Sequence, residues 1–331
     1  MKPLETVRWG ILGCGDVCER KSGPPMYLTG HSQLAAVMRR DAAKAADFAR
    51  RHGVGKVYTD VGALLADPGI DIIYVATPHA LHCAQTIRAL EAGKDVYVEK
   101  PMAMTHAECL GMLAAAERCG RRIFVAYYRR ALPYFRKVRK LLEHGAIGTP
   151  LCVEVRYLRP PAPGDSDPQQ RPWRLQRDVG GDGYFYDMAP HTLDILDFLL
   201  GEIAEARGCK ANRAGLYEVA DTVCASWRFA SGAVGTGTWC FAAPSGCRED
   251  SVRIVGSRGE IRFSTFAFTP VECSTPEGVA RFEIAPPEHI QGPLIETIVA
   301  ELRGEGRCPS TGVSAARTSR AMDRIMAEEI K

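Results

Sequence analysis

The chain has 331 residues, of which 46% are hydrophobic and 24% are charged, as in an ordinary globular protein of about two domains. The net charge is only +3, and the basic residues are scattered apart from an amphipathic helical stretch at 127–140, so we expect no nucleic-acid partner. No run of about 18 apolar residues occurs, which argues against a membrane span or a membrane partner.

The first 126 residues alternate between strand-like and helix-like segments. Short apolar runs predict strands at 7–12, 33–38, 71–76, 95–100 and 122–127. Longer segments predict helices at 42–53, 80–94 and 106–120, and the last two end in a glycine, the usual helix stop. Near-continuous apolar strands that alternate with helices indicate a parallel sheet covered on both faces. We therefore expect residues 1–126 to form an α/β nucleotide-binding domain.

Residues 127–331 show a different pattern. We expect a helix at 131–144, a strand at 150–160 that runs into a Pro-rich loop, and a helix at 188–200. Strands follow at 224–230, 233–242, 251–257, 259–265 and 270–276, with "GSRGE" as a hairpin turn, and helices at 291–303 and 313–330 close the chain. Consecutive strands with short connections indicate an antiparallel or mixed sheet, so this part is predicted to be an α+β domain.

The twelve cysteines occur singly and without a C-x-x-C pair, mostly among apolar residues. This usage is typical of reduced thiols rather than of a disulfide framework. The N-terminus passes straight into a strand-like run and shows no apolar region of a signal peptide. We therefore expect a cytoplasmic protein.

A glycine-rich loop follows the first strand directly. In "WGILGCGDVCERK", Gly13 and Gly15 occupy the first two positions of the G-x-G-x-x-G pattern, and Cys18 occupies the third. The first glycine permits a tight turn, and the second lets the backbone approach a pyrophosphate. A purely structural turn is the alternative, but the alternating strands and helices favour dinucleotide binding. The loop residues expected to bind the cofactor are Gly13, Cys14, Gly15, Asp16 and Val17.

The end of the second strand indicates which dinucleotide is bound. A protein selective for NAD places an acidic residue there, on the ribose 2′-hydroxyl. This chain has Arg39 and Arg40 at that point, and Asp41 comes only afterwards. Because arginine offers paired donors to a phosphate, we predict NADP as the preferred cofactor, with NAD as the alternative. Two solvated arginines that merely open the next helix would favour neither.

Four stretches together resemble one family, the Gfo/Idh/MocA oxidoreductases. They are "GCGDV" (13–17), "ATPHALH" (76–82), "ALEAGKDVYVEKPMA" (89–103) and "GGDGYFYDMAPHTLDILDFLLG" (180–201). The resemblance covers nearly the whole chain and looks closest to the branch of dihydrodiol dehydrogenases, glucose–fructose oxidoreductases and 1,5-anhydrofructose reductases. It implies an N-terminal Rossmann domain and a C-terminal domain with a large, mostly antiparallel sheet. It also implies a homodimer or homotetramer formed through that sheet.

Lys100 ends a buried strand in "DVYVEKPMA", where a charged residue is ordinarily solvated. The resemblance implies instead that Lys100 lies in the active site, that its bond to Pro101 is cis, and that Glu99 adjoins the nicotinamide. A cis proline costs little more than the trans form and fixes a tight turn. We therefore expect Lys100 at the carboxyl edge of the sheet, where α/β proteins bind ligands.

A second group of polar residues lies in "DMAPHTLDILDF". Because Pro190 is tolerable only in a first turn, we expect the helix to begin near Asp187 or Met188, with Asp187 and His191 on one face. From the residues alone, Asp187 is equally readable as a helix cap, and His191 as an ordinary core or surface histidine. The resemblance implies that both lie in the active site. We then expect His191 as the principal acid/base, Lys100 as its electrostatic and proton partner, and Asp187 as support, while the division of proton transfer stays open.

The resemblance implies further contacts. The segment after the strand at 71–76 is expected beside the cofactor, with residues Thr77, Pro78, His79 and His82. The substrate pocket is expected to include Tyr128 and Arg129, together with Asp187 and His191. Trp173 and Arg174 match a pair that reaches the cofactor from the second domain, although a buried tryptophan and a solvated arginine would look the same. No metal-ligand spacing occurs, and hydride chemistry needs no metal because the nicotinamide carries it.

We predict an NADP-preferring oxidoreductase that transfers hydride to or from a sugar, a polyol or a related hydroxyl or carbonyl compound. Two alternatives stay open. One is an enzyme with permanently bound NADP that exchanges hydride between two sugars, and the other is a non-catalytic NADP-binding sensor.

Overall fold

The computed structural model describes residues 3–327, which form two compact units. The first unit holds the chain up to residue 132 together with residues 287–316, and the second holds residues 133–286 together with the chain from 317 onward. The expected boundary after residue 126 lies near the first of these limits. The segment 287–316, which the sequence pattern assigns to the second domain, belongs to the first unit. Its apolar side chains explain this, since Leu294, Ile295 and Ile298 are buried in one core with Trp9 and Tyr74.

Six parallel strands form the sheet of the first unit. They are β1 (Val7–Leu12), β2 (Ser32–Met38), β3 (Lys56–Tyr58), β4 (Ile72–Val75), β5 (Asp95–Val98) and β6 (Ile123–Val125). The order β3-β2-β1-β4-β5-β6 is that of a Rossmann sheet, in which the strand order reverses between β1 and β4. The predicted Rossmann fold is therefore confirmed. The sequence pattern does not reveal β3, because its three residues are largely exposed and too few to show a period.

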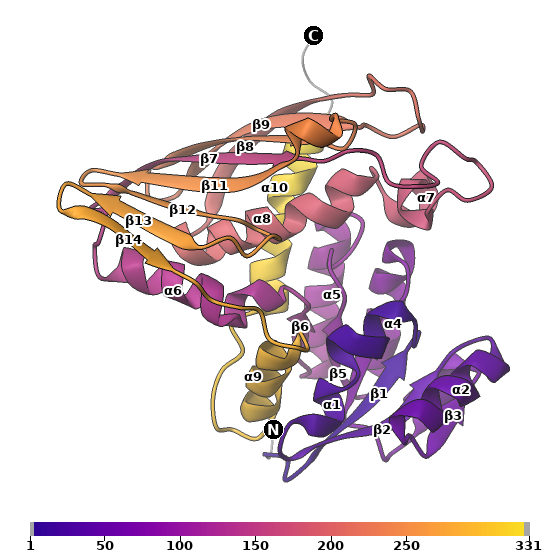
Figure 1. Cartoon of the computed structure of the whole chain (residues 1–331). Helices are drawn as coiled ribbons and strands as arrows, with labels where there is room; N and C mark the ends of the chain where they lie inside the picture. Colours follow the sequence, from indigo (N-terminus) through magenta and orange to yellow (C-terminus); the bar gives the residue numbers. More distant parts are fainter. Residues whose placement is uncertain (1–2, 328–331) are drawn as a thin grey trace. The chain divides into compact units, whose positions relative to one another are not determined.

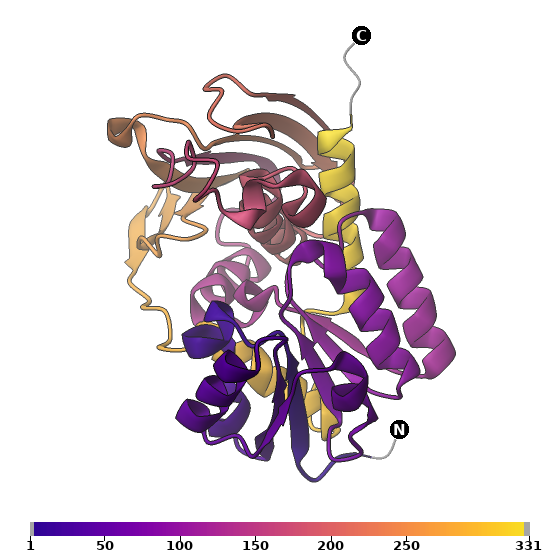
Figure 2. The ribbon, with the colours of Figure 1, turned by 90° about the vertical axis from the view of Figure 1, so that its right-hand side faces the viewer.

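Helices cover both faces of this sheet (Figure 2). They are η1 (Cys18–Ser22), α1 (Pro25–Leu28), α2 (Ala42–His52), α3 (Val61–Ala66), η2 (His79–Leu81), α4 (His82–Glu91), α5 (His106–Cys119), η3 (Tyr128–Ala131) and α9 (Gly292–Leu302). One apolar core contains side chains of α4 and α5, and the other contains side chains of α2 and α9. Gly120 ends α5 in the left-handed conformation, as the sequence predicts, and Gly53 ends α2 in the same way.

An eight-stranded sheet dominates the second unit (Figure 1). Its strands are β7 (Pro150–Leu158), β8 (Ile203–Ala211), β9 (Thr222–Phe229), β10 (Val234–Cys240), β11 (Glu249–Gly256), β12 (Glu260–Phe263), β13 (Val271–Thr275) and β14 (Gly278–Phe282). The order is β14-β13-β12-β11-β7-β10-β9-β8, and every neighbouring pair is antiparallel except β7 and β10. This confirms the mostly antiparallel sheet. The "GSRGE" turn also forms, because the Gly256 N–H donates to the Gly259 carbonyl at 2.8 Å.

One face of this sheet is buried and the other is exposed. In β9, the side chains of Val223, Trp227 and Phe229 are buried, while those of Cys224 and Arg228 between them are exposed. The buried face lies against α8 (Tyr184–Leu200), as Figure 1 shows. The sequence analysis does not predict the edge strands β8 and β14, because each mixes small, polar and charged residues.

The start of α8 corrects one sequence expectation. The helix begins at Tyr184 rather than near Asp187, so Pro190 lies inside it and not in its first turn. Gly183 precedes the helix with φ +72°, and a Cβ there would lie 2.5 Å from Val219 Cγ2. Tyr184, Phe185 and Tyr186 are all buried. Burial of these aromatic rings outweighs the main-chain hydrogen bond that a proline inside a helix forfeits.

Five further helices complete the described residues. They are α6 (Pro133–Glu143), η4 (Trp173–Leu175), α7 (Arg177–Gly180), η5 (Ser245–Cys247) and α10 (Gly312–Met326). The end of the last expected helix, at residues 328–330, lies outside the described residues. Over residues 3–327, every helix is too short or too polar to cross a lipid bilayer.

Candidate functional site

The glycine loop after β1 is built around two backbone positions with different requirements. Gly13 has φ +93°, and a Cβ there would lie 2.8 Å from Thr77 Cγ2, so only glycine fits between the ends of β1 and β4. A Cβ at Gly15 would meet nothing closer than the Gly13 carbonyl oxygen, 3.9 Å away. The main chain at Gly15 is therefore open to a ligand, as a pyrophosphate requires.

Cys18 occupies the third position of the glycine pattern and is fully buried. It opens the π-helix η1, in which the Gly23 N–H donates to the Cys18 carbonyl at 3.1 Å. Burial raises the pKa of the Cys18 thiol well above its usual range, so the group stays a neutral, apolar filler of the core. With Cys18 at the third position, the loop still has Gly13 and Gly15 in the geometry described above.

A cavity of about 860 Å³ lies where the glycine loop, the end of β2, the start of α2 and the end of β4 meet. Its lining includes the predicted residues Gly13, Cys14, Gly15, Arg39, Arg40, Thr77 and Pro78. Lys44 also lines the cavity, and its ammonium lies 3.4 Å from the carboxylate of Asp41, which caps α2. Three cations and one carboxylate therefore surround this part of the cavity. The sequence analysis misses Lys44, because its approach depends on the first turn of α2.

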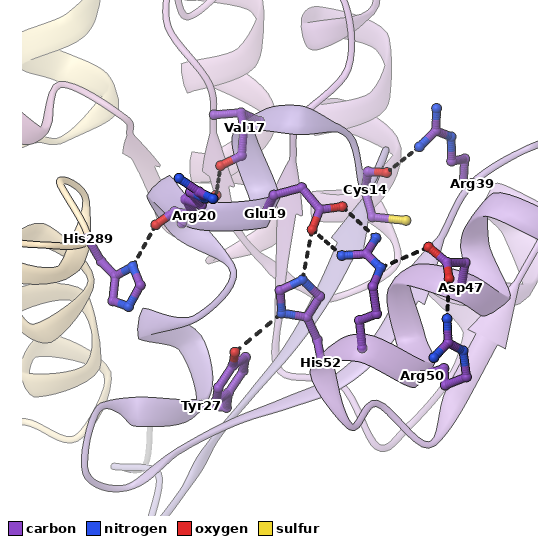
Figure 3. Close-up of polar contacts among 12 residues, drawn as sticks. Cys14, Val17, Glu19, Arg20, Tyr27, Arg39, Asp47, Arg50, His52 and His289 are labelled. Carbon is purple, nitrogen blue, oxygen red and sulfur yellow. Dashed lines mark hydrogen bonds and ion pairs between the residues drawn. The ribbon is translucent and has the colours of Figure 1, made fainter.

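Arg39 is attached to the glycine loop. Its Nη1 donates to the main-chain oxygen of Cys14 at 3.1 Å (Figure 3). Its own N–H donates to the Tyr58 carbonyl at 3.2 Å, so the main chain at the end of β2 is also held. The guanidinium therefore lies beside the cavity in a defined place, with further donors for an anion.

A second polar group connects the segment after the glycine loop to α2 (Figure 3). The Glu19 carboxylate accepts two hydrogen bonds from Arg51 and lies 3.1 Å from His52 Nε2. The bonds from Arg51 and His52 lower the pKa of Glu19 to about 2. Arg51 also donates to Asp47 at 2.8 Å. This group fixes η1 against the helix whose first turn lines the cavity.

Lys100 lies two residues after β5, at the carboxyl edge of the sheet, and its peptide bond to Pro101 is cis as expected. His82, which is fully buried, contacts the turn at Lys100 and Pro101. His82 Nδ1 lies 2.8 Å from the Pro101 carbonyl oxygen, and Nε2 lies 2.8 Å from that of Thr77. Burial lowers the pKa of His82. His82 thus joins the turn at Lys100 to the turn at Thr77.

Glu99 is held by a buried network that reaches α9. Its Oε1 accepts from the Tyr74 hydroxyl at 2.5 Å and from Gln291 Nε2 at 2.7 Å, and its Oε2 accepts from the Lys100 N–H at 3.2 Å. The Tyr97 hydroxyl donates to Gln291 Oε1 at 2.7 Å, which fixes the orientation of the amide. Burial, with the charge of Glu99, raises the pKa of the Tyr74 and Tyr97 hydroxyls, so both remain donors. Gln291 follows Glu99 by 192 residues, and no motif marks it.

The other first-unit candidates lie at strand ends. His79 is buried, and its ring stands edge-on to that of His82 with centroids 5.6 Å apart. Tyr128 and Arg129 begin η3 just after β6, and the Arg129 guanidinium lies 4.9 Å from the centre of the Tyr128 ring. Arg129 is only 3% exposed. The lining of the 860 Å³ cavity includes none of His79, His82, Glu99 and Lys100.

In the second unit, Asp187 lies in the first turn of α8 and forms an ion pair with Arg174 at 3.0 Å. The Arg174 guanidinium stacks over the Trp173 ring, 4.6 Å from its centre. His191 follows Asp187 by one turn, is 5% exposed and stands edge-on to Phe266 at 5.7 Å. The structure thus brings Trp173, Arg174 and Asp187 together. Asp194, one turn beyond His191, accepts a hydrogen bond from the Thr318 hydroxyl in α10 at 3.3 Å.

Within residues 3–327, no three His, Cys, Asp or Glu side chains come together as a metal site would require. The first unit combines a dinucleotide-type glycine loop with a cation cluster beside it and titratable groups at the end of β5, and α8 of the second unit carries further titratable groups. Together with the Rossmann order of strands, these features are those of a dinucleotide-binding protein.

Comparison with known proteins gives the family. Residues 7–127 match the oxidoreductase family with an NAD-binding Rossmann fold, and residues 135–262 match the GFO/IDH/MocA C-terminal domain. The chain is 35% identical to "Oxidoreductase P35" of Formosa agariphila over 319 residues, which cover 96% of this chain and 97% of the relative. It is 32% identical to the 1,5-anhydro-D-fructose reductase of Ensifer adhaerens over 69% of this chain and 67% of that one. The chain belongs to the Gfo/Idh/MocA family and is an NAD(P)-dependent dehydrogenase or reductase.

Solved structures agree on the fold. An oxidoreductase from Agrobacterium radiobacter, crystallised with NAD+, L-tartaric acid and magnesium, superposes with a TM-score of 0.86. The match covers 97% of this chain and 95% of the other at 21% identity. This likeness supports the two-unit architecture.

Proposed function

We propose that this protein is an NADP-preferring oxidoreductase that transfers hydride to or from a sugar, a polyol or a related hydroxyl or carbonyl compound. The observation that carries the cofactor preference is the cluster of Arg39, Arg40 and Lys44 at one cavity, opposed by the single carboxylate of Asp41. A 2′-phosphate is close to a dianion and accepts several bonds from guanidinium groups. The substrate class rests on the relative named as a 1,5-anhydro-D-fructose reductase.

The loop fits the cofactor by its own geometry. Gly13 leaves no room for a Cβ, while Gly15 offers open main chain on the cavity side. A pyrophosphate is proposed to lie at Gly13, Cys14, Gly15, Asp16 and Val17, and the adenosine ribose near Arg39 and Arg40. Thr77 and Pro78 are proposed to lie along the same molecule, since both line the cavity. When bound, the nicotinamide supplies or accepts the hydride.

The chain's own groups are proposed to handle the proton and the charge. His191 acts as the principal acid/base, because an imidazole exchanges protons readily near neutral pH. Lys100 polarises the substrate oxygen and shares in proton transfer, and Asp187 supports His191. Tyr128 and Arg129 are assigned to the substrate. Trp173, Arg174, His79 and Glu99 are assigned to the cofactor, and His82 acts through the two turns that it joins.

The assembly is proposed to be a homodimer or homotetramer that forms through the exposed face of the eight-stranded sheet. That face carries ordered ion pairs, such as Arg156 with Glu249 at 2.8 Å and Arg253 with Glu154 at 3.2 Å. Light scattering coupled to size exclusion measures the mass. A monomer at micromolar concentration rejects the assembly and leaves the enzymatic proposal intact.

The test of activity is a screen of NADP(H) and NAD(H) absorbance with sugars, polyols, dicarbonyls and dihydrodiols, run in both directions. We expect turnover of at least one sugar-like compound with a higher kcat/KM for the phosphorylated cofactor. Absence of turnover in all four classes, with NADP bound tightly by calorimetry, would favour a sensor. Higher kcat/KM for NAD overturns the cofactor preference.

A further inference from the structure

Two cysteines face each other across neighbouring strands at the edge of the second unit's sheet. The register of β8 and β9 places Cys209 directly opposite Cys224, and the pairing is regular from Glu205 to Ala211. Both residues are exposed. Since β8 is an edge strand with β9 as its partner, this pair lies at the rim of the sheet and not at its centre.

Both side chains point to the exposed face. A Cβ on Gly208, the neighbour of Cys209, would lie 2.7 Å from Ile325 Cγ2 of α10, so Gly208 faces the helix and Cys209 faces away from it. In β9, the neighbour Val223 is fully buried and Cys224 is exposed. The Cys224 Sγ lies 3.7 Å from Thr238 Oγ1 of β10 on that same face. The two thiols therefore share one face of the sheet.

The main-chain hydrogen bonds identify the kind of pair. The Phe229 N–H donates to the Ala233 carbonyl on the β10 side at 2.9 Å, and the next N–H, of Ala230, donates to the Glu202 carbonyl on the β8 side at 2.8 Å, so the odd residues of β9 bond toward β10. Cys224, an even residue in the same unbroken register, therefore bonds toward β8 and forms a hydrogen-bonded pair with Cys209. Such a pair has its Cα atoms about 5.5 Å apart, within the range of disulfides.

The Cβ atoms of a cross-strand pair lie about 4.5–5.5 Å apart, whereas a disulfide prefers about 3.8 Å. Forming the disulfide must therefore draw β8 slightly toward β9. An edge strand can make this movement because it has a neighbour on one side only. A disulfide formed at such a cost, and exposed to solvent, is easily reduced again. The remaining exposed cysteine, Cys247 in η5, has no such cross-strand partner and gives a matched internal control.

We propose that Cys209 and Cys224 form a reversible dithiol–disulfide site that reacts with low-molecular-weight disulfides such as oxidised glutathione. One thiolate attacks the glutathione disulfide, forming a mixed disulfide and releasing one glutathione thiol. The second cysteine then displaces the other glutathione, so one S–S bond is broken, one is formed, and two thiols are released. The site is independent of the proposed hydride transfer, and it requires that an assembly formed through this face leave the β8 edge open.

The test treats the full-length, native protein with oxidised glutathione and follows it by intact mass and peptide mapping. The wild-type protein is expected to lose two hydrogen atoms and to yield one linked peptide pair containing Cys209 and Cys224, while Cys247 gains glutathione. Reduced glutathione should restore both thiols. In Cys209→Ser and in Cys224→Ser, the remaining cysteine should instead retain bound glutathione, because no second thiol displaces it.

Cys247→Ser is the matched control and should still form the internal disulfide. The site is rejected if wild-type Cys209 and Cys224 retain two glutathiones, or if both stay unreactive in the native assembly while Cys247 reacts. Circular dichroism of each serine variant shows whether it is folded. If a single variant is unfolded, the linked peptide in the wild-type protein still decides the outcome.

Discussion

Arg39 donates a hydrogen bond to the main-chain oxygen of Cys14 at 3.1 Å, so its guanidinium lies against the glycine loop (Figure 3). The main chain joins the same two segments, because the Gly13 N–H donates to the Met38 carbonyl at the end of β2 at 2.9 Å. The bond to Cys14 holds the arginine beside the 860 Å³ cavity before any cofactor arrives. A group held in place loses less entropy when it binds a phosphate. The choice between the two dinucleotides is therefore expected to depend on this residue.

Arg39→Asp should reverse the cofactor preference. The aspartate repels a 2′-phosphate and accepts a bond from the ribose hydroxyl of NAD. A charge-assisted contact is worth about 1.5–3 kcal/mol, which is roughly one to two decades in affinity. Calorimetric titration with NADP and NAD measures the ratio. Arg50→Asp on the solvent side of α2, where Arg50 pairs with Asp47, is the control and should leave the ratio unchanged. An unchanged ratio in Arg39→Asp contradicts the assignment.

Lys100→Ala should lower turnover by about a hundredfold or more while the affinity for NADP stays within a few fold. That loss is typical of a positioned proton-transfer group. Stopped-flow absorbance at saturating substrate measures the hydride step, and calorimetry measures cofactor binding. The exposed Lys140→Ala in α6 serves as the control for a lost lysine charge. Turnover close to that of the wild type would remove Lys100 from the catalytic group.

His191→Ala should flatten one limb of the pH–rate profile, because the group that titrates in that range is removed. The plot of kcat against pH makes this distinction, since loss of a binding contact alone would raise KM and keep the profile. His144→Ala, at an exposed position in the same unit, tests for a general effect of removing an imidazole. A wild-type profile in His191→Ala would make this histidine a binding residue.

The glycine loop and the alternation of strands and helices are predictable because both depend on neighbouring residues. Gly13 must be glycine because a Cβ there would collide with Thr77 at the end of β4, and the G-x-G pattern in the sequence indicates this requirement. The fold is harder to predict from the sequence where tertiary contacts determine the local structure. Pro190 lies inside α8 because buried aromatic residues extend the helix by a turn, which a rule on proline position does not foresee.

The site shows the same limit. Arg39, Arg40 and Thr77 follow strands, and strand ends at one edge of a parallel sheet come together. Gln291 bonds to Glu99 because residues 287–316, which include α9, pack in the first unit. No local sequence pattern predicts this packing. The ion pair of Arg174 with Asp187 likewise depends on the fold of the loop before α8. Contacts between residues far apart in the chain therefore stay hidden until the fold is known.

Glu19→Gln should destabilise the protein at neutral pH and flatten its acid dependence. The pKa of Glu19 is lowered from 4.5 to about 2, so its bonds to Arg51 and His52 stabilise the fold fully above pH 4.5. That contribution is lost as the pH falls toward 2. Because Glu19 and Arg51 are 34% and 40% exposed, we expect a loss of about 0.2–1 kcal/mol, or about 0.3–1.5 °C in Tm for a chain of 331 residues. Thermal melts of both proteins between pH 7 and pH 2 should converge at the acid end; a constant difference would contradict this.

Gln291→Glu should turn a constant hydrogen bond into one that depends on pH. Gln291 Nε2 donates to Glu99 at 2.7 Å, and a carboxylate in its place would face Glu99 without a proton to offer. If Glu99 adjoins the nicotinamide as proposed, its displacement should lower kcat by about ten- to a hundredfold at neutral pH. Acidification protonates the new carboxyl group, which can then donate, so kcat relative to the wild type should recover. Gln291→Leu, which cannot donate at any pH, should show no recovery, and fluorescence titration with NADPH should follow the same pattern. Equal, pH-independent losses in both variants would mean that Gln291 only fills space in the core.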